Sequence, residues 1–323
     1  MPEIRPIVVV GSVNMDLVLR TPRIPAPGET ILGENFVTIP GGKGANQAVA
    51  AAKLAREGTQ VHMVGRVGDD DFGQRLLNGL TGHGVHTRHV TVTEGIPSGV
   101  AMILVDRRGE NSIVVAPGAN AKLSPADVDA AEGLIATASA VVMQLEVPLK
   151  TVEHTLALCQ QHGVFTILDP APVPPKMPRA LYGVDVLTPN QNEAERLLGL
   201  NPAHALTPKR TEDPKLVTTR LLSRGSRSVV LKRGSRGAVL IDRDGVIRTV
   251  KGFKIKVVDT TAAGDAFTAA LAVAHAEGME LPAAVRFANA AGAIACQSFG
   301  AQPGLPGREA VDQLMGERAR GSG

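Results

Sequence analysis

The chain has 323 residues and a net charge of only +3, and 2 % of its residues are aromatic, with no Trp and one Tyr. The sequence has no long basic run and no set of stacking aromatics, which argues against a nucleic-acid partner. The N-terminal apolar run is too short for a secretory or membrane segment, and Cys159 and Cys296 lie too far apart for a zinc motif. We therefore expect a cytoplasmic protein with reduced thiols and no membrane partner.

Apolar runs alternate with helical patterns along the chain. The runs are almost continuously apolar, which is typical of strands buried on both faces of a parallel sheet. One helix is predicted to begin after Gly41 and Gly42, and another after Ser124, an N-cap residue followed by Pro125. The alternation predicts an α/β fold with a mostly parallel, doubly wound sheet. The predicted strands are residues 7–13, 61–67, 140–146, 164–170, 184–190 and 228–234.

Residues 17–40 and 98–117 break this pattern, because they alternate with a period of two and carry turn residues. They do not fit a parallel sheet, so we expect a small separate sheet that flanks the site. The whole chain, 1–323, is then one domain with this lid sheet inserted in two pieces. The polar, proline-rich segment 201–215 is predicted to be a surface excursion.

Several polar residues follow predicted strands, where ligands bind in open α/β sheets. In residues 257–267, VVDTTAAGDAF, Asp259 ends an apolar run and Asp265 opens a predicted helix. The three small residues before Asp265 leave backbone N–H groups at the helix start open to an anion. Because Asp265 is itself an anion at the same place, it must have another use. The other polar residues at strand ends are Asn14, Asp16, Glu146 and Asn190.

Two glycine-containing segments and the pair of Asn190 and Glu193 have both a structural and a functional interpretation. Residues 40–48 fit a plain turn into a helix, or a helix start whose polar side chains grip a hydroxylated ligand. Residues 232–237 fit a tight hairpin turn, or a loop whose backbone donors bind a nucleotide. Asn190 and Glu193 have the spacing of a helix capping box, or serve a site for metal and phosphate.

Two further clusters favour structural roles. The three acids at 69–71 favour a helix N-terminus by their charge, and the three histidines within 83–89 favour a solvated loop. The sequence contains no Walker loop and no GxGxxG, GxSxG, HExxH or CxxC motif. Dinucleotide, serine hydrolase and zinc protease interpretations therefore lose their main support.

Seven segments occur in an order that is specific to one protein family. They are GSVNMD (11–16), PGGKGANQAVAAA (40–52), MQLE (143–146), TPNQNEAE (188–195), GSRG (234–237), VDTTAAGDAF (258–267) and GAQP (300–303). On these motifs the chain resembles the ribokinase/phosphofructokinase-B family of carbohydrate kinases over nearly its whole length. The resemblance implies a Rossmann-like αβα sandwich with a β-sheet lid, an ATP-dependent kinase that phosphorylates the 5-hydroxyl of D-ribose, and a homodimer formed through the lid.

The resemblance also implies roles for individual residues. Asp265 matches the catalytic base, and Ala262, Ala263 and Gly264 match the helix start that stabilises the transferring phosphoryl group. The positions that hold the sugar are Asn14, Asp16, Gly42, Lys43, Gly44, Ala45, Asn46 and Glu146. The positions that hold the nucleotide are Asn190, Lys232, Arg233, Gly234, Ser235, Arg236, Gly237, Gly264 and Asn289.

Two cations are implied by the same resemblance. Mg²⁺ is required to bridge the terminal phosphates of ATP, and Glu193 is expected to help organise it through water. A monovalent cation, usually K⁺, is used by members of the family. Gly304 departs from the related pattern, which often has Ser there, and this difference affects the expected K⁺ site. The matching K⁺ positions are Asp259, Thr261, Ala295, Ser298, Gly300 and Gly304.

Two alternatives to a ribose kinase stay open. The first is a sibling kinase that acts on deoxyribose, a nucleoside or another sugar, and the second is a non-catalytic sugar-binding protein on the same fold. Asn14 and Asp16 favour a ligand with several ring hydroxyls, because a site built to pair a hydroxyl rejects a ligand that lacks it. Asp265 and the intact residues before it argue for catalysis.

Overall fold

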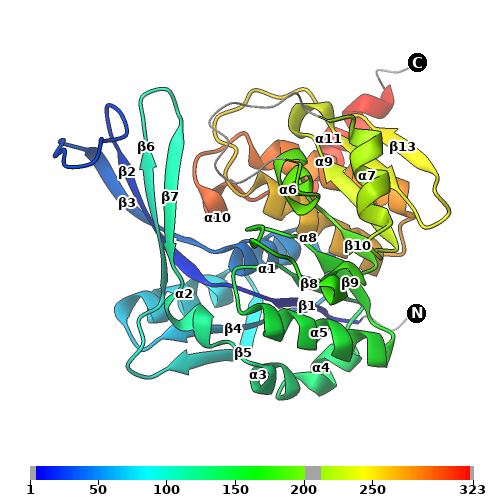
Figure 1. The fold of residues 1–323 in the computed structure, drawn as a ribbon, viewed down its shortest axis with the longest axis horizontal. Helices are drawn as coiled ribbons and strands as arrows, with labels where there is room; N and C mark the ends of the chain where they lie inside the picture. Colours follow the sequence, from blue (N-terminus) through cyan, green and yellow to red (C-terminus); the bar gives the residue numbers. More distant parts are fainter. Residues whose placement is uncertain (1–4, 201–211, 321–323) are drawn as a thin grey trace.

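The structure is a computed structural model that describes residues 5–200 and 212–320. Its centre is a nine-stranded sheet in the order β13-β12-β11-β10-β9-β8-β1-β4-β5 (Figure 1). Pairing is parallel from β5 to β11 and antiparallel for β12 and β13. The strands are β1 (Ile7–Val10), β4 (Val61–Gly68), β5 (Val85–Thr93), β8 (Ala140–Met143), β9 (Phe165–Leu168), β10 (Val186–Leu187), β11 (Ser228–Lys232), β12 (Ala238–Ile241) and β13 (Ile247–Val250).

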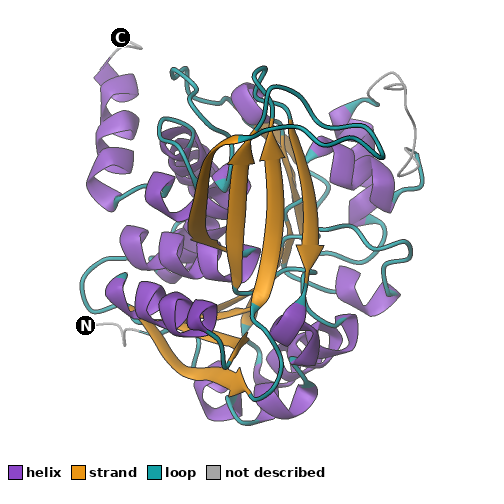
Figure 2. Ribbon diagram, turned by 90° about the vertical axis from the view of Figure 1, so that its left-hand side faces the viewer, coloured by secondary structure: helices purple, strands orange, loops and turns teal. Residues whose placement is uncertain are grey.

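Helices cover both faces of this sheet (Figure 2). The side chains of β1 alternate between these two faces. Ile7 and Val9 belong to one buried apolar cluster, whereas Val8 and Val10 belong to another, because successive side chains of a strand point to opposite faces. The first cluster includes α1 (Lys43–Leu54), α2 (Asp71–Gly82), α8 (Ala263–Ala276), α9 (Leu281–Ala295) and α11 (Arg308–Arg320). The second includes α3 (Pro125–Asp129), α4 (Glu132–Ala136), α5 (Leu149–His162), α6 (Gln191–Leu197) and α7 (Pro214–Leu222).

All six predicted strands are present, and three further strands, β5, β12 and β13, were not predicted. β5 is an edge strand in which many side chains are polar and partly exposed, so its apolar periodicity is weak. The interpretation of residues 83–89 as a solvated loop is therefore wrong, since His86 and His89 lie on β5. The His86 ring stacks on the ring of His62 in β4, with centroids 4.6 Å apart.

Helix starts follow the local signals closely. α1 begins directly after Gly42, and Asp70 caps α2 by accepting a hydrogen bond from the Gly73 N–H at 2.8 Å. Ser124 begins a helix as predicted, and its backbone N–H donates to Asp127 at 2.8 Å. The single helix expected after Ser124 is instead divided into the short helices α3 and α4.

A second sheet has the order β3-β2-β6-β7 and stands beside the main sheet (Figure 1). The small separate sheet expected from residues 17–40 and 98–117 is thus present, although its first strand begins earlier, at Asn14. Its strands are β2 (Asn14–Arg20), β3 (Glu34–Gly41), β6 (Gly99–Val105) and β7 (Asn111–Ala116). Because β1 leads directly into β2, residues of this lid sheet lie next to the end of the central strand.

Within the described ranges, none of the helices has the length and apolar character needed to cross a membrane. Most of the predicted excursion at 201–215 lies outside the described residues. Its described end, at Glu212, donates a backbone hydrogen bond to Glu195 in α6 at 3.3 Å, and α7 begins two residues later.

Candidate active site

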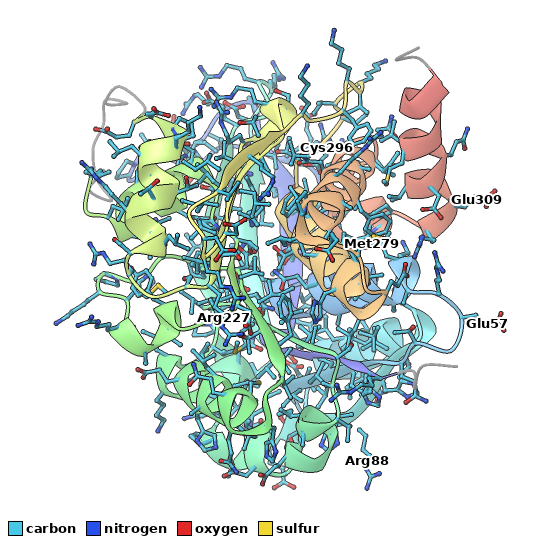
Figure 3. The ribbon with its side chains drawn as sticks, turned by 90° about the vertical axis from the view of Figure 1, so that its right-hand side faces the viewer. Glu57, Arg88, Arg227, Met279, Cys296 and Glu309 are labelled. Carbon is cyan, nitrogen blue, oxygen red and sulfur yellow. The ribbon has the colours of Figure 1, made fainter. Side chains whose placement is uncertain are left out.

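A cavity of about 710 Å³ lies beyond the carboxyl ends of β9, β10 and β11 and beside the start of α8. Parallel strands end at the same edge of the sheet, so residues far apart in the sequence meet there. Cys296, the C-cap of α9, also lines this cavity, at the opposite end of α9 from Met279 (Figure 3). Site residues expected from the sequence that line it are Lys43, Asn190, Glu193, Lys232, Arg233, Gly234, Ser235, Gly237, Ala262, Ala263, Gly264, Asp265 and Asn289.

The start of α8 presents open backbone donors to the cavity. Ala262 adopts a left-handed conformation with φ of 58°, and the Ala263 N–H donates to Thr260 at 3.3 Å. The next two N–H groups, of Gly264 and Asp265, have no acceptor in the described part of the chain. A Cβ added to Gly264 would meet only the Lys232 ammonium, at 3.5 Å. The small residues therefore leave room for an anion beside the helix start.

Asp265 is 5 % exposed and is held at both carboxylate oxygens. One oxygen accepts from the Asn46 side chain and the other from the Gln47 side chain, each at 3.0 Å. Burial raises the pKa of Asp265, and the nearby carboxylate of Asp169 raises it further, whereas Lys43 and the two amide donors oppose this rise. A carboxylate with a raised pKa and a fixed orientation is suited to accept a proton.

Gln47 and Asp169 belong to this site, although the sequence analysis did not select them. The Gln47 amide nitrogen donates to both Asp265 and Asp169, the latter at 3.1 Å, and Lys232 donates to the other oxygen of Asp169 at 2.9 Å. The Gln144 side chain donates to Gln47 at 2.6 Å. Asp169 directly follows β9, so the strand-end criterion applied to Glu146 would also have selected it.

A second group of polar residues lies where β2, β8 and α1 meet. Glu146 accepts from the Ser12 hydroxyl at 2.6 Å and from the Lys43 backbone N–H at 3.1 Å. Asp16 is nearly buried, and burial followed by the charges of Glu146 and Asp265 raises its pKa to about 7. These carboxylates thus form one electrostatically coupled cluster together with Asp265.

Asn14 is positioned by a residue that the sequence analysis missed. Its side-chain oxygen accepts from the Asn120 amide at 2.7 Å, while the Asn120 oxygen accepts from the Val13 N–H at 2.8 Å. The side-chain nitrogen of Asn14 donates no hydrogen bond to the described residues, and it stays free for a ligand. Asn120 carried no signal in the sequence, because it comes from a short 3₁₀ helix rather than from a strand end.

Glycines at 41–44 bring α1 close to this group. Gly42 has a φ of 88°, a conformation that favours glycine, and a Cβ there would lie 2.6 Å from the Asn14 backbone nitrogen. A Cβ on Gly44 would lie 2.6 Å from the Ser12 nitrogen. The close approach allows Asn46 to reach Asp265 across the site, whereas Ala45, also predicted to hold the sugar, is fully buried in the core.

Two buried polar atoms directly beside Asp265 or the cavity have no partner among the described residues. They are the side-chain oxygen of Asn46, beside Asp265, and the Nε atom of Arg233, beside the cavity. Buried polar atoms without a partner are costly, so a bound ligand that pairs with them would stabilise this arrangement.

The structural interpretation is confirmed for both segments that are expected to hold the nucleotide, the Asn190–Glu193 pair and residues 232–237. The Asn190 side chain accepts from the Glu193 N–H at 2.9 Å and Glu193 accepts from the Asn190 N–H at 2.7 Å, which completes a capping box. Residues Gly234–Arg236 form a 3₁₀ turn between the antiparallel strands β11 and β12. Both segments also line the cavity, with the exception of Arg236. The structural and ligand-binding interpretations are therefore compatible.

Oxygen atoms converge beside Gly304 on the other side of the α8 start. A Cβ on Gly304 would lie 3.2 Å from the Ala295 carbonyl oxygen and 3.4 Å from that of Ser298, and neither carbonyl accepts a backbone hydrogen bond from another described residue. Asp259 accepts from the Gly300 N–H at 2.9 Å and from the Thr261 hydroxyl at 2.7 Å. Burial opposes ionisation of Asp259, but these donors outweigh it and lower its pKa.

No group of three or more His, Cys, Asp or Glu residues in the described ranges is arranged to hold a metal ion by itself. Asp169, Glu193 and Asp265 nevertheless supply carboxylates to the cavity wall. Burial raises the pKa of Glu193, and Lys232 opposes that rise. Of these, Glu193 fits Mg²⁺, which is commonly held by one or two carboxylates, water and the phosphates of a substrate. Asp169 and Asp265 instead accept hydrogen bonds from Lys232 and from the amides of Asn46 and Gln47.

Comparisons with known proteins identify the family. Residues 5–308 match the pfkB family of carbohydrate kinases, and the chain belongs to this family. It is 41 % identical over 314 residues to a ribokinase of Bacillus subtilis, with 96 % of this chain and 99 % of the relative covered. It is 34 % identical to a deoxyribokinase of Salmonella typhimurium, with 96 % of this chain and 98 % of the relative covered.

A solved structure extends the comparison to bound ligands. The structure of Arabidopsis thaliana ribokinase complexed with ribose and ATP matches with a TM-score of 0.84 and 34 % identity, over 97 % of this chain and 99 % of that chain. The expected αβα architecture with a small separate sheet is thus that of ribokinase structures, and the chain is a member of a family of kinases.

Proposed function

We propose that this protein transfers the γ-phosphoryl group of ATP to the 5-hydroxyl of D-ribose, giving D-ribose 5-phosphate and ADP. The observation that carries the proposal is the buried carboxylate of Asp265, held by two amides next to open N–H groups at the start of α8. The similarity to ribokinases over nearly the whole chain supports ribose as the acceptor.

Asp265 acts as the general base in this proposal. It takes the proton of the sugar hydroxyl while the hydroxyl oxygen attacks the γ-phosphorus, and its raised pKa brings proton acceptance closer to neutral pH. The N–H groups of Gly264 and Asp265, which have no acceptor among the described residues, form an anion hole at the helix start predicted from residues 262–264. This anion hole stabilises the negative charge of the phosphoryl group in transfer, which is the main task in such reactions. The absence of larger side chains there keeps the space open for phosphate oxygens.

The polar group around β2 and α1 is the proposed sugar site. Asn14, Asp16 and Glu146 pair with ring hydroxyls, and the unpartnered oxygen of Asn46 adds an acceptor beside Asp265. The other proposed sugar contacts are Gly42, Lys43 and Gly44, whereas Ala45 is left out because it is fully buried in the core. A site with several fixed polar groups favours ribose over 2-deoxyribose, because a missing hydroxyl leaves a buried group unpaired.

The cavity of about 710 Å³ is the proposed nucleotide site. The unpartnered Arg233 Nε atom and the turn after β11 supply donors for phosphates, and Mg²⁺ bound to the terminal phosphates neutralises their charge, organised through water by Glu193. The remaining proposed nucleotide contacts are Asn190, Lys232, Gly234, Ser235, Arg236, Gly237, Gly264 and Asn289.

We further propose that K⁺ binds beside Gly304 and activates the enzyme. Carbonyl oxygens are the ligands that K⁺ prefers, and those of Ala295 and Ser298 point into one space. Asp259 supplies the negative charge, with Thr261 and Gly300 fixing its position. Gly304 in place of Ser removes one hydroxyl from this set.

The lid sheet is proposed to form a homodimer with the lid of a second copy. Phe36, Met102, Ile113 and Val114 are each at least half exposed, and the last two are neighbours on β7 whose side chains point to opposite faces. Asp16 lies on one face of the lid, beside the proposed sugar site, whereas Met102 and Val114 lie in register with Leu17 on the other face. That other face presents exposed apolar side chains of the kind that mark an interface. A cytoplasmic location is proposed as well, supported by Cys159 and Cys296 being free thiols.

The first test is ADP release from MgATP in the presence of KCl, with D-ribose, 2-deoxyribose, D-fructose and adenosine as acceptors. We expect strong turnover with ribose alone. A preference for 2-deoxyribose or adenosine would keep the chemistry and replace the sugar assignment. The absence of turnover with every acceptor would favour a binding-only protein.

The role of the base is tested with Asp265→Asn. We expect turnover to fall by about 10²–10⁴-fold, the usual contribution of a general base, while ribose still binds in calorimetry. Asp71→Asn, on the exposed first turn of α2, is the matched control and is expected to keep full activity. Full activity in Asp265→Asn would overturn the mechanism.

A further inference from the structure

A continuous chain of side-chain hydrogen bonds links Lys232, at the cavity wall, to Asp265 through Asp169 and Gln47. Lys232 donates to Asp169 at 2.9 Å, and the Gln47 amide donates to Asp169 at 3.1 Å and to Asp265 at 3.0 Å. Gln47 is fully buried, Asp169 is almost fully buried, and the Lys232 side chain is 12 % exposed. Gln144 donates to the oxygen of Gln47, which orients the Gln47 nitrogen toward the two carboxylates.

The position of the Lys232 ammonium is unusual for a simple structural ion pair. It lies 3.5 Å from where a Cβ of Gly264 would be, next to the N–H groups that lack acceptors at the start of α8. A helix N-terminus carries partial positive charge, so a cation beside it is unfavourable unless an anion lies between them. The Asp169 carboxylate compensates the charge of the Lys232 ammonium through their hydrogen bond, and Lys232 also lines the cavity.

We propose that Lys232 is a catalytic residue that binds the phosphoryl group during its transfer, and that Asp169 and Gln47 are positioning residues that link Lys232 to Asp265. The proposal rests on the proposed function, because it assigns the role of these residues in that reaction. This role differs from that of the other nucleotide-site residues, because Lys232 contacts only the γ-phosphoryl group that is transferred from ATP.

The step balances without any further reactant. The acceptor oxygen forms a bond to the γ-phosphorus, the bond from that phosphorus to the bridging oxygen breaks, and ADP leaves with the electron pair. The proton of the acceptor hydroxyl goes to Asp265. Lys232 donates hydrogen bonds to the phosphoryl oxygens and takes no part in the proton transfer.

Nucleotide binding tests Lys232 without any acceptor. Calorimetry is performed with MgADP and with the non-hydrolysable triphosphate MgAMPPNP on the wild type and on Lys232→Met. We expect Lys232→Met to lose about tenfold or more in affinity for AMPPNP and less than about threefold for ADP, because a hydrogen bond to a charged group is lost only with the triphosphate. Turnover is expected to fall by about 10²–10³-fold with the ribose KM unchanged.

Lys256→Met is the matched control, since Lys256 is an exposed lysine in the segment between β13 and α8 and does not line the cavity. It is expected to bind both nucleotides as the wild type does. Equal losses for ADP and AMPPNP in Lys232→Met, or no loss for either, would overturn the proposal. Because this contrast needs no acceptor, a wild type that fails to phosphorylate ribose would refute the proposed function without deciding the role of Lys232.

The positioning residues are tested by the pH profile of kcat/KM. Gln47→Leu removes a donor that lowers the pKa of Asp265, so the acidic limb is expected to move to higher pH. Asp169→Asn removes a charge that raises this pKa, so the limb is expected to move to lower pH. Opposite shifts are not produced by a merely structural role.

Gln47→Glu keeps the size of the side chain and serves as a second variant if Gln47→Leu does not fold, as judged by its thermal melt. It places a third carboxylate beside the other two and is also expected to move the acidic limb upward. Lower activity with an unmoved profile in the folded variants would refute the positioning roles.

Discussion

Asp16 is a single residue whose charge responds to pH near neutrality. Burial beside Glu146 and Asp265 raises the pKa of Asp16 to about 7, far above the value of 3.8 for an unperturbed aspartate. Between about pH 4 and pH 7 the folded protein therefore holds a proton on Asp16 that the unfolded chain has released. The free energy of unfolding accordingly falls as the pH rises through this window, because the folded state binds the extra proton.

Replacing Asp16 by Asn removes this fall in the free energy of unfolding with rising pH, because the Asn side chain does not titrate. We expect the Tm difference between Asp16→Asn and the wild type to grow in favour of the variant from pH 5 to pH 7, reaching on the order of 5 °C, and then to level off. Scanning fluorimetry without ribose measures it. Asp71→Asn, in the exposed first turn of α2, is the control expected to give the same difference at each pH. A difference that does not depend on pH would contradict the raised pKa.

The start of α8 illustrates how one element serves two proposed ligands. Its open N–H groups face the cavity, while the segment just before it, with Asp259, faces the carbonyls of Ala295 and Ser298. A cation on that side would hold the backbone before α8 in place and thereby fix the anion hole. Activation by K⁺ would then act through the geometry of the helix start rather than through contact with the substrate.

This arrangement predicts that Asp259→Ala abolishes activation by KCl, because the negative charge of the proposed site is lost. The measurement is ribose phosphorylation across a KCl titration, with NaCl holding the ionic strength constant. Asp244→Ala, in the exposed turn between β12 and β13, is expected to keep the activation. Unchanged activation in Asp259→Ala would remove this residue from the K⁺ site.

At the scale of the whole molecule, β7 at the edge of the lid sheet is exposed along its whole length. Its residue Val114 is 69 % exposed. A four-stranded sheet with apolar side chains exposed in this way is stabilised when a second sheet packs on it. Closure of the lid over the sugar would also keep water from the γ-phosphate.

The dimer proposal predicts that Val114→Asp dissociates the protein into monomers, because burying an unpaired carboxylate in an apolar interface is costly. Sedimentation velocity at micromolar concentration checks this expectation. Val246→Asp changes an exposed valine between β12 and β13, which belong to the main sheet and not to the lid. This variant is expected to leave the mass unchanged. A wild type that sediments as a monomer would refute the dimer.

The sequence by itself determined the local structure and the outline of the site. The apolar runs predicted six strands, the Asn190–Glu193 spacing predicted a capping box, and the small residues before Asp265 predicted an open helix start, because each of these depends on neighbouring residues. β5 and the division between α3 and α4 were not predictable in this way, since an edge strand and a short break between helices leave weak periodic signals.

Only the tertiary structure decided which of the polar residues work together. Gln47 meets residues 122 and 218 positions away, and Lys232 meets Asp169 across 63 positions. The carbonyls of Ala295 and Ser298, which accept no backbone hydrogen bond from another described residue, were reached from the sequence only through the family resemblance. Residue types give no signal for them, because every residue has a carbonyl. The physical reason is the same for both: parallel strands and helix ends gather distant backbone and side chains at one edge of the sheet, and spacing along the chain does not record that meeting.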